Sequence, residues 1–160
     1  MSEINTEVRP VGTIERIIEY RDGRREVTTF KNTVLQKGKE ALAACLANNV
    51  GDQFDFFVGR MLFGDGGTVN GVPKIVGADR DGLFGITRVS KPVIASIPYQ
   101  TSASQVIFTA VVGFDDGNGY PLNEMALQMN NGHLYSMATF ADLNKTASFQ
   151  ITWNWSISFL

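Results

Sequence analysis

The sequence contains very few of the residues that enzymes and metal centres use. Among 160 residues there is one cysteine, Cys45, and one histidine, His133. A single cysteine has no partner for a disulfide within the chain, and a single histidine leaves little for a Ser-His-Asp arrangement or a histidine-rich metal site. We therefore expect Cys45 to be a small buried apolar residue and His133 to be an exposed ring beside a turn. We expect no catalytic, cofactor or metal site.

A dominant charge and a long apolar run are also missing. The formal net charge is -2, whereas nucleic acid and anionic lipid both require a basic surface. No apolar run reaches the roughly 18 residues that a membrane helix needs. The opening residues MSEINTEVRP lack the basic region and apolar core of a secretory signal. These absences predict a protein that is made in a reducing cytoplasm and binds neither nucleic acid nor membrane.

Most of the chain shows strand patterns. TIERIIEY and REVTTF flank an Asp-Gly turn, which predicts a hairpin over residues 13–30, with 1–12 as a flexible N-terminal segment. LNEMALQM and HLYSMATF flank Asn-Asn-Gly and predict a second hairpin. SQVIFTAVVGF has apolar residues at both its odd and its even positions, which favours a central strand buried on both faces. KPVIASIPYQ contains two prolines and fits an edge strand.

The last thirteen residues, SFQITWNWSISFL, alternate between large apolar and small polar side chains. Burial of the apolar parity, at roughly 1.5–3 kcal/mol for each side chain, would hold this strand between two neighbours or against another subunit. The opposite parity is uncharged and can form hydrogen bonds across an interface without the cost of burying a charge. Asn154 and Ser156 are therefore candidate subunit-interface residues. The alternative is that this face is simply solvated.

One segment has helical rather than strand periodicity. NTVLQKGKEALAACLANN predicts a helix over about 33–47, capped by Asn32 or Thr33, with Leu35, Leu42, Cys45 and Leu46 on one face. Together these elements predict a mainly β fold, with residues 13–160 forming one antiparallel β-sandwich domain that carries a single helix.

Residues 64–91 hold seven glycines and few periodic apolar residues. A long irregular stretch inside a compact domain usually serves function or binds a partner. We expect this Gly-rich loop to be mobile alone and to contact partner subunits. Leu83 and Phe84 are the candidate apolar anchors, and Arg80 and Arg88 are candidate charged contacts at the interface rim.

One acidic residue, Glu124, lies among apolar residues of the second hairpin. It could be a buried acid with a partner or an outward-facing strand residue. Carboxylates are almost never fully buried unless they are paired, so we favour the outward-facing position.

The segment GYPLNEMALQMNNGHLYSMATFADLNKTASFQITWNWSISF resembles the end of small β-rich modules in tailed-bacteriophage virion proteins, especially the attachment module of tail-collar fibres. In those modules an NE-x-x-L strand passes through an Asn/Asp-Gly turn to an LY-x-x-A-x-F strand, a lysine-containing loop and a long alternating strand. The matching residues here are Asn123, Glu124, Leu127, Asn131, Gly132, Leu134, Tyr135, Ala138, Phe140 and Lys145. The stretch FGDGGTVNGVP is similar to glycine-rich loops of phage structural proteins.

The resemblance implies a non-enzymatic virion structural protein of the tail or baseplate, acting as an assembly or fibre-attachment module. It implies a homo-oligomer, a trimer or a ring, in contact with other virion structural proteins, and a location in the virion after synthesis in the host bacterial cytoplasm. A capsid decoration or neck-collar protein is an open alternative, because sequence alone does not place a β-module on the particle. A more distant alternative is a carbohydrate- or small-ligand-binding sandwich that uses the loop with Phe84 and Tyr99.

Overall fold

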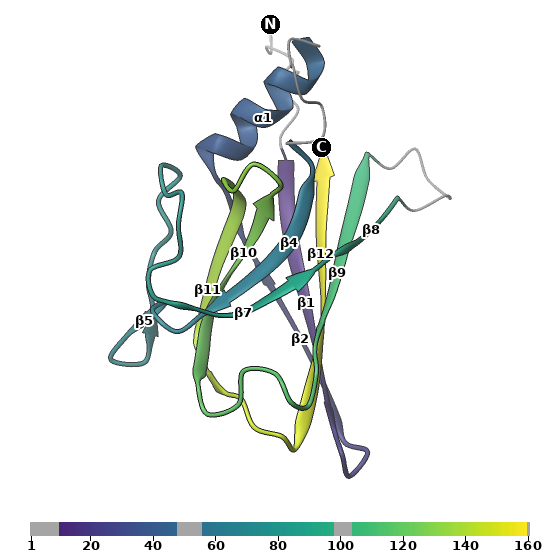
Figure 1. The fold of residues 1–160 in the computed structure, drawn as a ribbon, viewed down its shortest axis with the longest axis vertical. Helices are drawn as coiled ribbons and strands as arrows, with labels where there is room; N and C mark the ends of the chain where they lie inside the picture. Colours follow the sequence, from purple (N-terminus) through teal and green to yellow (C-terminus); the bar gives the residue numbers. More distant parts are fainter. Residues whose placement is uncertain (1–9, 48–55, 98–103, 160) are drawn as a thin grey trace, which may run out of the picture.

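The computed structural model describes residues 10–47, 56–97 and 104–159, which form an antiparallel β-sandwich (Figure 1). The first sheet has the order β2-β1-β12-β9-β8, and the second has the order β3-β11-β10-β4-β7. The first consists of β1 (Pro10–Tyr20), β2 (Arg25–Lys31), β8 (Ile94–Ser96), β9 (Gln105–Val112) and β12 (Phe149–Phe159). The second consists of β3 (Thr33–Val34), β4 (Val58–Gly64), β7 (Thr87–Pro92), β10 (Pro121–Met129) and β11 (Leu134–Asn144). A small pair, β5 (Thr68–Val69) and β6 (Val72–Pro73), and one helix, α1 (Gln36–Ala47), complete the described elements.

The core lies between the two sheets and is centred on the tryptophans of β12. Trp153 and Trp155 are fully buried. The ring centroid of Trp153 lies 5.2 Å from that of Phe63 and 5.5 Å from that of Phe140, both in the second sheet. Strand β12 pairs with β1 on one side and β9 on the other, so its backbone is hydrogen-bonded along both edges. The prediction that neighbouring strands hold the last strand is confirmed.

At both sides of the sandwich the chain crosses directly from one sheet to the other. On one side β2 leads through Asn32 into β3, and on the other β7 leads through Val93 into β8. Strands that change sheets form the corners of such sandwiches. The four edge strands are therefore the strands that flank these two crossings: β2 and β3 at one side, and β7 and β8 at the other.

The two predicted hairpins are present. β1 pairs with β2, and β10 pairs with β11. Gly23 and Gly132 have φ values of 92° and 90°, a left-handed conformation that glycine adopts at little cost. Residues 10–12 belong to β1, so the segment predicted to be flexible, 1–12, wrongly included the first three residues of a strand. Residues 1–9 lie outside the described residues.

The helix exists, but its start was predicted wrongly and its buried face only partly correctly: Leu35 is buried just before the helix and Leu42 packs against the core, whereas Cys45 and Leu46 are exposed. Thr33–Val34 pairs with β11 as β3, so the helix begins at Gln36 and neither predicted cap is used. The buried positions are Gly38 and Ala41, where the helix approaches β11 closely; a Cβ at Gly38 would lie 2.9 Å from Cδ2 of Tyr135. Cys45 is exposed and Leu46 is 89% exposed, because the last turn projects beyond the sheets (Figure 1).

The outer faces of the two sheets differ. On the outer side of the second sheet a separate apolar cluster forms from Leu35, Leu62, Ala126, Leu134 and Met137, and Val76, Leu83 and Phe84 of the Gly-rich segment pack against it. Strand β9 of the first sheet was predicted to be buried on both faces, but Val111 is 44% exposed while its neighbour Val112 is fully buried. Its outward side is exposed because no described element covers that face of the first sheet.

Candidate assembly surfaces

The six predicted interface residues lie in two separate places. Arg80, Leu83, Phe84 and Arg88 belong to the 64–91 segment at the second sheet. Asn154 and Ser156 lie on the outer face of the first sheet, in β12. The sandwich core separates these sets, so the structure does not combine them into one surface.

The Gly-rich segment contains more regular structure than predicted, and it contacts its own domain. It contains β5, β6 and most of β7, and its longest part without a strand is 74–86. Leu83 and Phe84 are half-buried against the outer cluster of the second sheet. Their predicted role as anchors for a partner stays a prediction, but part of each side chain already packs within the chain.

The segment is held by the carboxylate of Glu124. Its Oε1 accepts hydrogen bonds from the backbone amides of Gly66 at 3.0 Å and Gly85 at 2.8 Å. Its Oε2 accepts one from the amide of Phe84 at 2.7 Å. A carboxylate that receives several amide donors is a strong anchor, because hydrogen bonds to a charged acceptor are about twice as strong as neutral ones.

Glu124 leaves its strand on the outer side, as predicted, but it is fully buried rather than exposed. The residues that bury it come from 39 to 58 positions away in the chain and are brought over β10 by the fold. The preference for an outward-facing residue over a buried acid with partners was therefore correct about the side and wrong about the burial. Its partners are backbone amides rather than a basic side chain, which is why no charge pattern in the sequence indicated them.

Small side chains are required around this carboxylate. A Cβ at Gly64 would lie 2.5 Å from Glu124 Oε1, and one at Gly66 would lie 2.5 Å from the Cα of Gly85. Real Cβ atoms essentially never come so close to other heavy atoms, so a side chain at Gly66 would force the backbone apart, and one at Gly64 would displace the Glu124 carboxylate from its position. Glycine at these positions therefore allows the chain segments around Gly66 and Gly85 to pack closely over Glu124.

The neighbouring residue, Asn123, also forms hydrogen bonds to the Gly-rich segment. Its Oδ1 accepts from the amide of Gly67 at 2.7 Å, and its Nδ2 donates to Oδ1 of Asp142 at 3.0 Å and to Oγ1 of Thr68 at 3.1 Å. The hydrogen bonds from Asn123 and Thr68 lower the pKa of Asp142. Asn123 therefore connects the start of the Gly-rich segment to β11.

Both candidate arginines also have partners within the chain. Arg88 Nε donates to Asp65 Oδ2 at 2.7 Å, and this hydrogen bond raises the pKa of Arg88. Arg80 donates to the carbonyl of Gly82 at 3.0 Å, and its Cζ lies 3.6 Å from the centroid of the Phe84 ring. One face of the Phe84 ring is therefore occupied by a guanidinium group. Tyr99, the other aromatic residue proposed for sugar binding, lies outside the described residues.

Lys145, which directly follows β11, is almost fully buried with 1% of its surface exposed. Its ammonium group donates to the carbonyl of Thr146 at 2.8 Å, to Asn118 Oδ1 at 3.0 Å and to the carbonyl of Phe114 at 3.3 Å. Burial lowers the pKa of this side chain. The lysine connects the loop after β9 to the loop between β11 and β12.

Asn154 and Ser156 face a shallow depression of about 520 Å³ on the outer side of the first sheet. Asn154 Nδ2 donates to Oε1 of Glu15 in β1 at 3.0 Å, and Asn154 Oδ1 accepts from Oγ1 of Thr109 in β9 at 2.8 Å. The amide of Asn154 therefore joins three adjacent strands through side chains alone.

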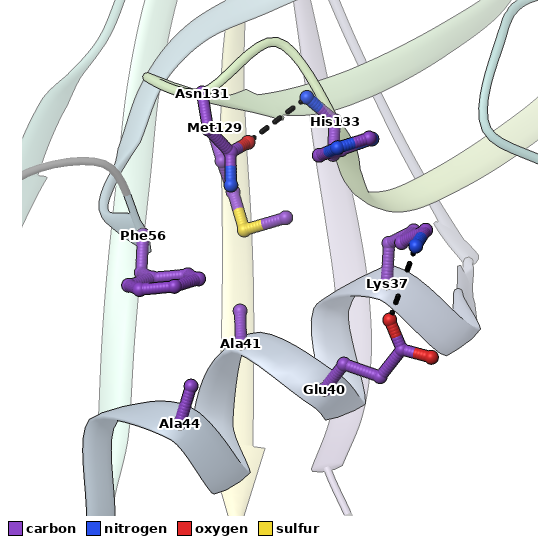
Figure 2. A pocket seen from close by; sticks show the side chains of 8 residues that line it. All are labelled: Lys37, Glu40, Ala41, Ala44, Phe56, Met129, Asn131 and His133. Atoms are coloured by element: carbon purple, nitrogen blue, oxygen red, sulfur yellow. Dashed lines mark hydrogen bonds and ion pairs between the residues drawn. The ribbon is translucent and has the colours of Figure 1, made fainter. Parts of the chain in front are cut away.

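A second depression, of about 290 Å³, lies between α1 and the β10–β11 turn (Figure 2). Lys37 and Glu40 form an ion pair at 3.3 Å at its helix side. His133 is exposed, as predicted, and its Nδ1 lies 2.6 Å from Oδ2 of Asp81. That contact links the turn to the Gly-rich segment.

In residues 10–47, 56–97 and 104–159, no group of three or more His, Cys, Asp or Glu side chains could hold a metal ion. No helix in the same ranges is long and apolar enough to span a bilayer. No protein-family model, curated protein or solved structure matches the chain.

Proposed function

We propose that this chain is a non-enzymatic structural protein of a bacteriophage virion, located in the tail or baseplate, where it acts as an assembly or fibre-attachment module. It forms a symmetric homo-oligomer and contacts other virion structural proteins. A capsid decoration or neck-collar protein is the alternative within the same class.

The observation that carries this proposal concerns buried polar residues. Four polar or charged side chains are buried in the described part of the chain: Asn123, Glu124, Ser136 and Lys145. Three of them, Asn123, Glu124 and Lys145, are residues on which the resemblance to phage modules rests. A buried polar side chain is costly unless the fold supplies its partners, so a match at these positions reflects the requirements of a particular fold.

The glycine-rich stretch adds to this support. The FGDGGTVNGVP stretch and the Asn-Glu pair are separate features of the sequence, about 60 residues apart. In the structure they form one unit, because Glu124 and Asn123 bind the amides of Gly66 and Gly67. The two stretches on which the resemblance rests therefore belong to one unit of the fold, which supports the proposal that they act together as a module.

The test is to locate the chain on virions of the phage that encodes it. Purified particles are analysed by mass spectrometry and then imaged in negative stain after gold labelling with an antibody against this chain. Label at the tail tip or at the fibre attachment points is the expected result. Label on the head or neck favours the capsid or collar alternative, and particles with neither peptide nor label overturn the proposal.

A further inference from the structure

The outer face of the first sheet combines exposed aliphatic side chains, uncharged polar side chains and charged side chains of both signs, namely Glu15, Glu19, Arg25 and Lys31. Val27 of β2 is 51% exposed, Val111 of β9 is 44% exposed and Ile94 of β8 is 75% exposed. Between them β12 presents Asn154 and Ser156. No described element covers this face, whereas the Gly-rich segment covers the outer face of the second sheet. The aliphatic side chains thus lie at both flanks of an uncovered face, with polar side chains between them.

The polar side chains in the middle of this face are complementary to a copy of themselves. The depression is lined by hydroxyl, amide and aliphatic groups and by one carboxylate: Thr13, Glu15, Thr29, Ser96, Ile107, Thr109, Asn154 and Ser156. Hydroxyl and amide groups can each donate and accept hydrogen bonds. Glu15 already accepts from Asn154. A face dominated by one charge would repel its own copy, and this face does not.

We propose that this face packs against the same face of a second copy of the chain, around a two-fold axis that runs along β12. This inference rests on the proposed function as an assembly module, and it assigns the surface and the partner. In such an isologous contact each copy uses the same patch. An axis along β12 places the β2 flank of one copy over the β8 flank of the other, so that Val27 and Ile94 meet as apolar partners.

The area of the face is sufficient for a specific contact. Five strands about 4.8 Å apart and about seven residues long at roughly 3.3 Å per residue span roughly 500 Å². Two such faces bury roughly 1,000 Å², which is the lower limit for a specific interface. An isologous contact joins copies in pairs, so a trimer or a ring would require a second contact elsewhere on the chain.

The full chain is studied by sedimentation velocity over a range of concentrations. Two variants place a cation on the face: Ser156→Arg near the proposed axis and Val111→Lys beside it. Thr87→Lys, at an exposed position of β7 in the other sheet, is the matched control. Fluorescence of the buried Trp153 and Trp155 checks that each variant is folded.

The expected result is a reversible dimer for the unchanged chain and the control. Each face variant should dissociate at least about tenfold more readily while remaining folded, because like charges would meet across the axis. A strictly monomeric chain, or folded face variants that associate as tightly as the control, would overturn the inference. Neither result depends on the virion test: a dimer that is absent from particles overturns only the proposed function, and a virion protein without this contact overturns only the inference.

Discussion

Replacing Glu124 with glutamine should release the Gly-rich segment from β10. A glutamine keeps the size of the side chain but has one acceptor oxygen in place of two. If that oxygen stays with Gly66 and Gly85, the amide of Phe84 faces an NH₂ group and loses its acceptor. The opposite orientation leaves two amides without an acceptor. At least one buried donor is therefore unsatisfied in either case.

The magnitude follows from these three hydrogen bonds. An unsatisfied buried amide costs about 1–3 kcal/mol, and each of the two remaining bonds loses about 1 kcal/mol when its acceptor becomes neutral. A neutral amide costs less to bury than a carboxylate, which offsets part of this loss. We expect Glu124→Gln to lower the free energy of unfolding by about 2–3 kcal/mol. Glu26→Gln, at an exposed position of β2, should change it by less than about 0.5 kcal/mol.

Two measurements test this reasoning. Urea unfolding followed by tryptophan fluorescence reports the sandwich core, because both tryptophans are fully buried there. Hydrogen exchange resolved to single amides reports the segment, and the amides of Phe84 and Gly85 should exchange faster in Glu124→Gln than in Glu26→Gln. If the glutamine variant unfolds like the control and protects these two amides as well as the unchanged chain does, the carboxylate does not anchor the segment.

Three further predictions concern packing, the last strand and pH. Gly85→Ala should lower the free energy of unfolding by about 1–3 kcal/mol in the same urea assay, because its Cβ would lie 2.6 Å from the amide nitrogen of Gly66; Gly82→Ala, which has open space around it, is the control, and equal effects would contradict the packing argument. Deleting residues 155–160 should abolish soluble folding, since it removes part of the strand between β1 and β9; a truncated chain with an unchanged cooperative transition in calorimetry would refute this. Burial raises the pKa of Tyr135 to about 12 from 10.0, so its contribution to stability is complete below pH 10 and is lost as the pH rises towards 12, by up to about 3 kcal/mol; Tyr135→Phe should lose less stability over that range in urea titrations, and identical pH profiles would argue against the shift.

The sequence alone was sufficient for features that depend on neighbouring residues. The alternation in β12 determines which side chains face the core, because successive side chains of a strand point to opposite sides. The Asp-Gly and Asn-Asn-Gly turns indicate both hairpins, since glycine adopts the required left-handed conformation at little cost. The sandwich class and the presence of one helix follow from the same local periodicities.

The tertiary structure decided the features that depend on distant residues. The helix buries Gly38 and Ala41 because β11 approaches it there, whereas the more hydrophobic Leu46 projects beyond the sheets. Glu124 is buried because the fold brings backbone amides over it, and backbone donors leave no signature in side-chain composition. The same packing covers the outer side of the second sheet but not that of the first. Local sequence determines the conformation and the side that each residue faces, but which faces are buried depends on contacts between segments that are far apart in the chain.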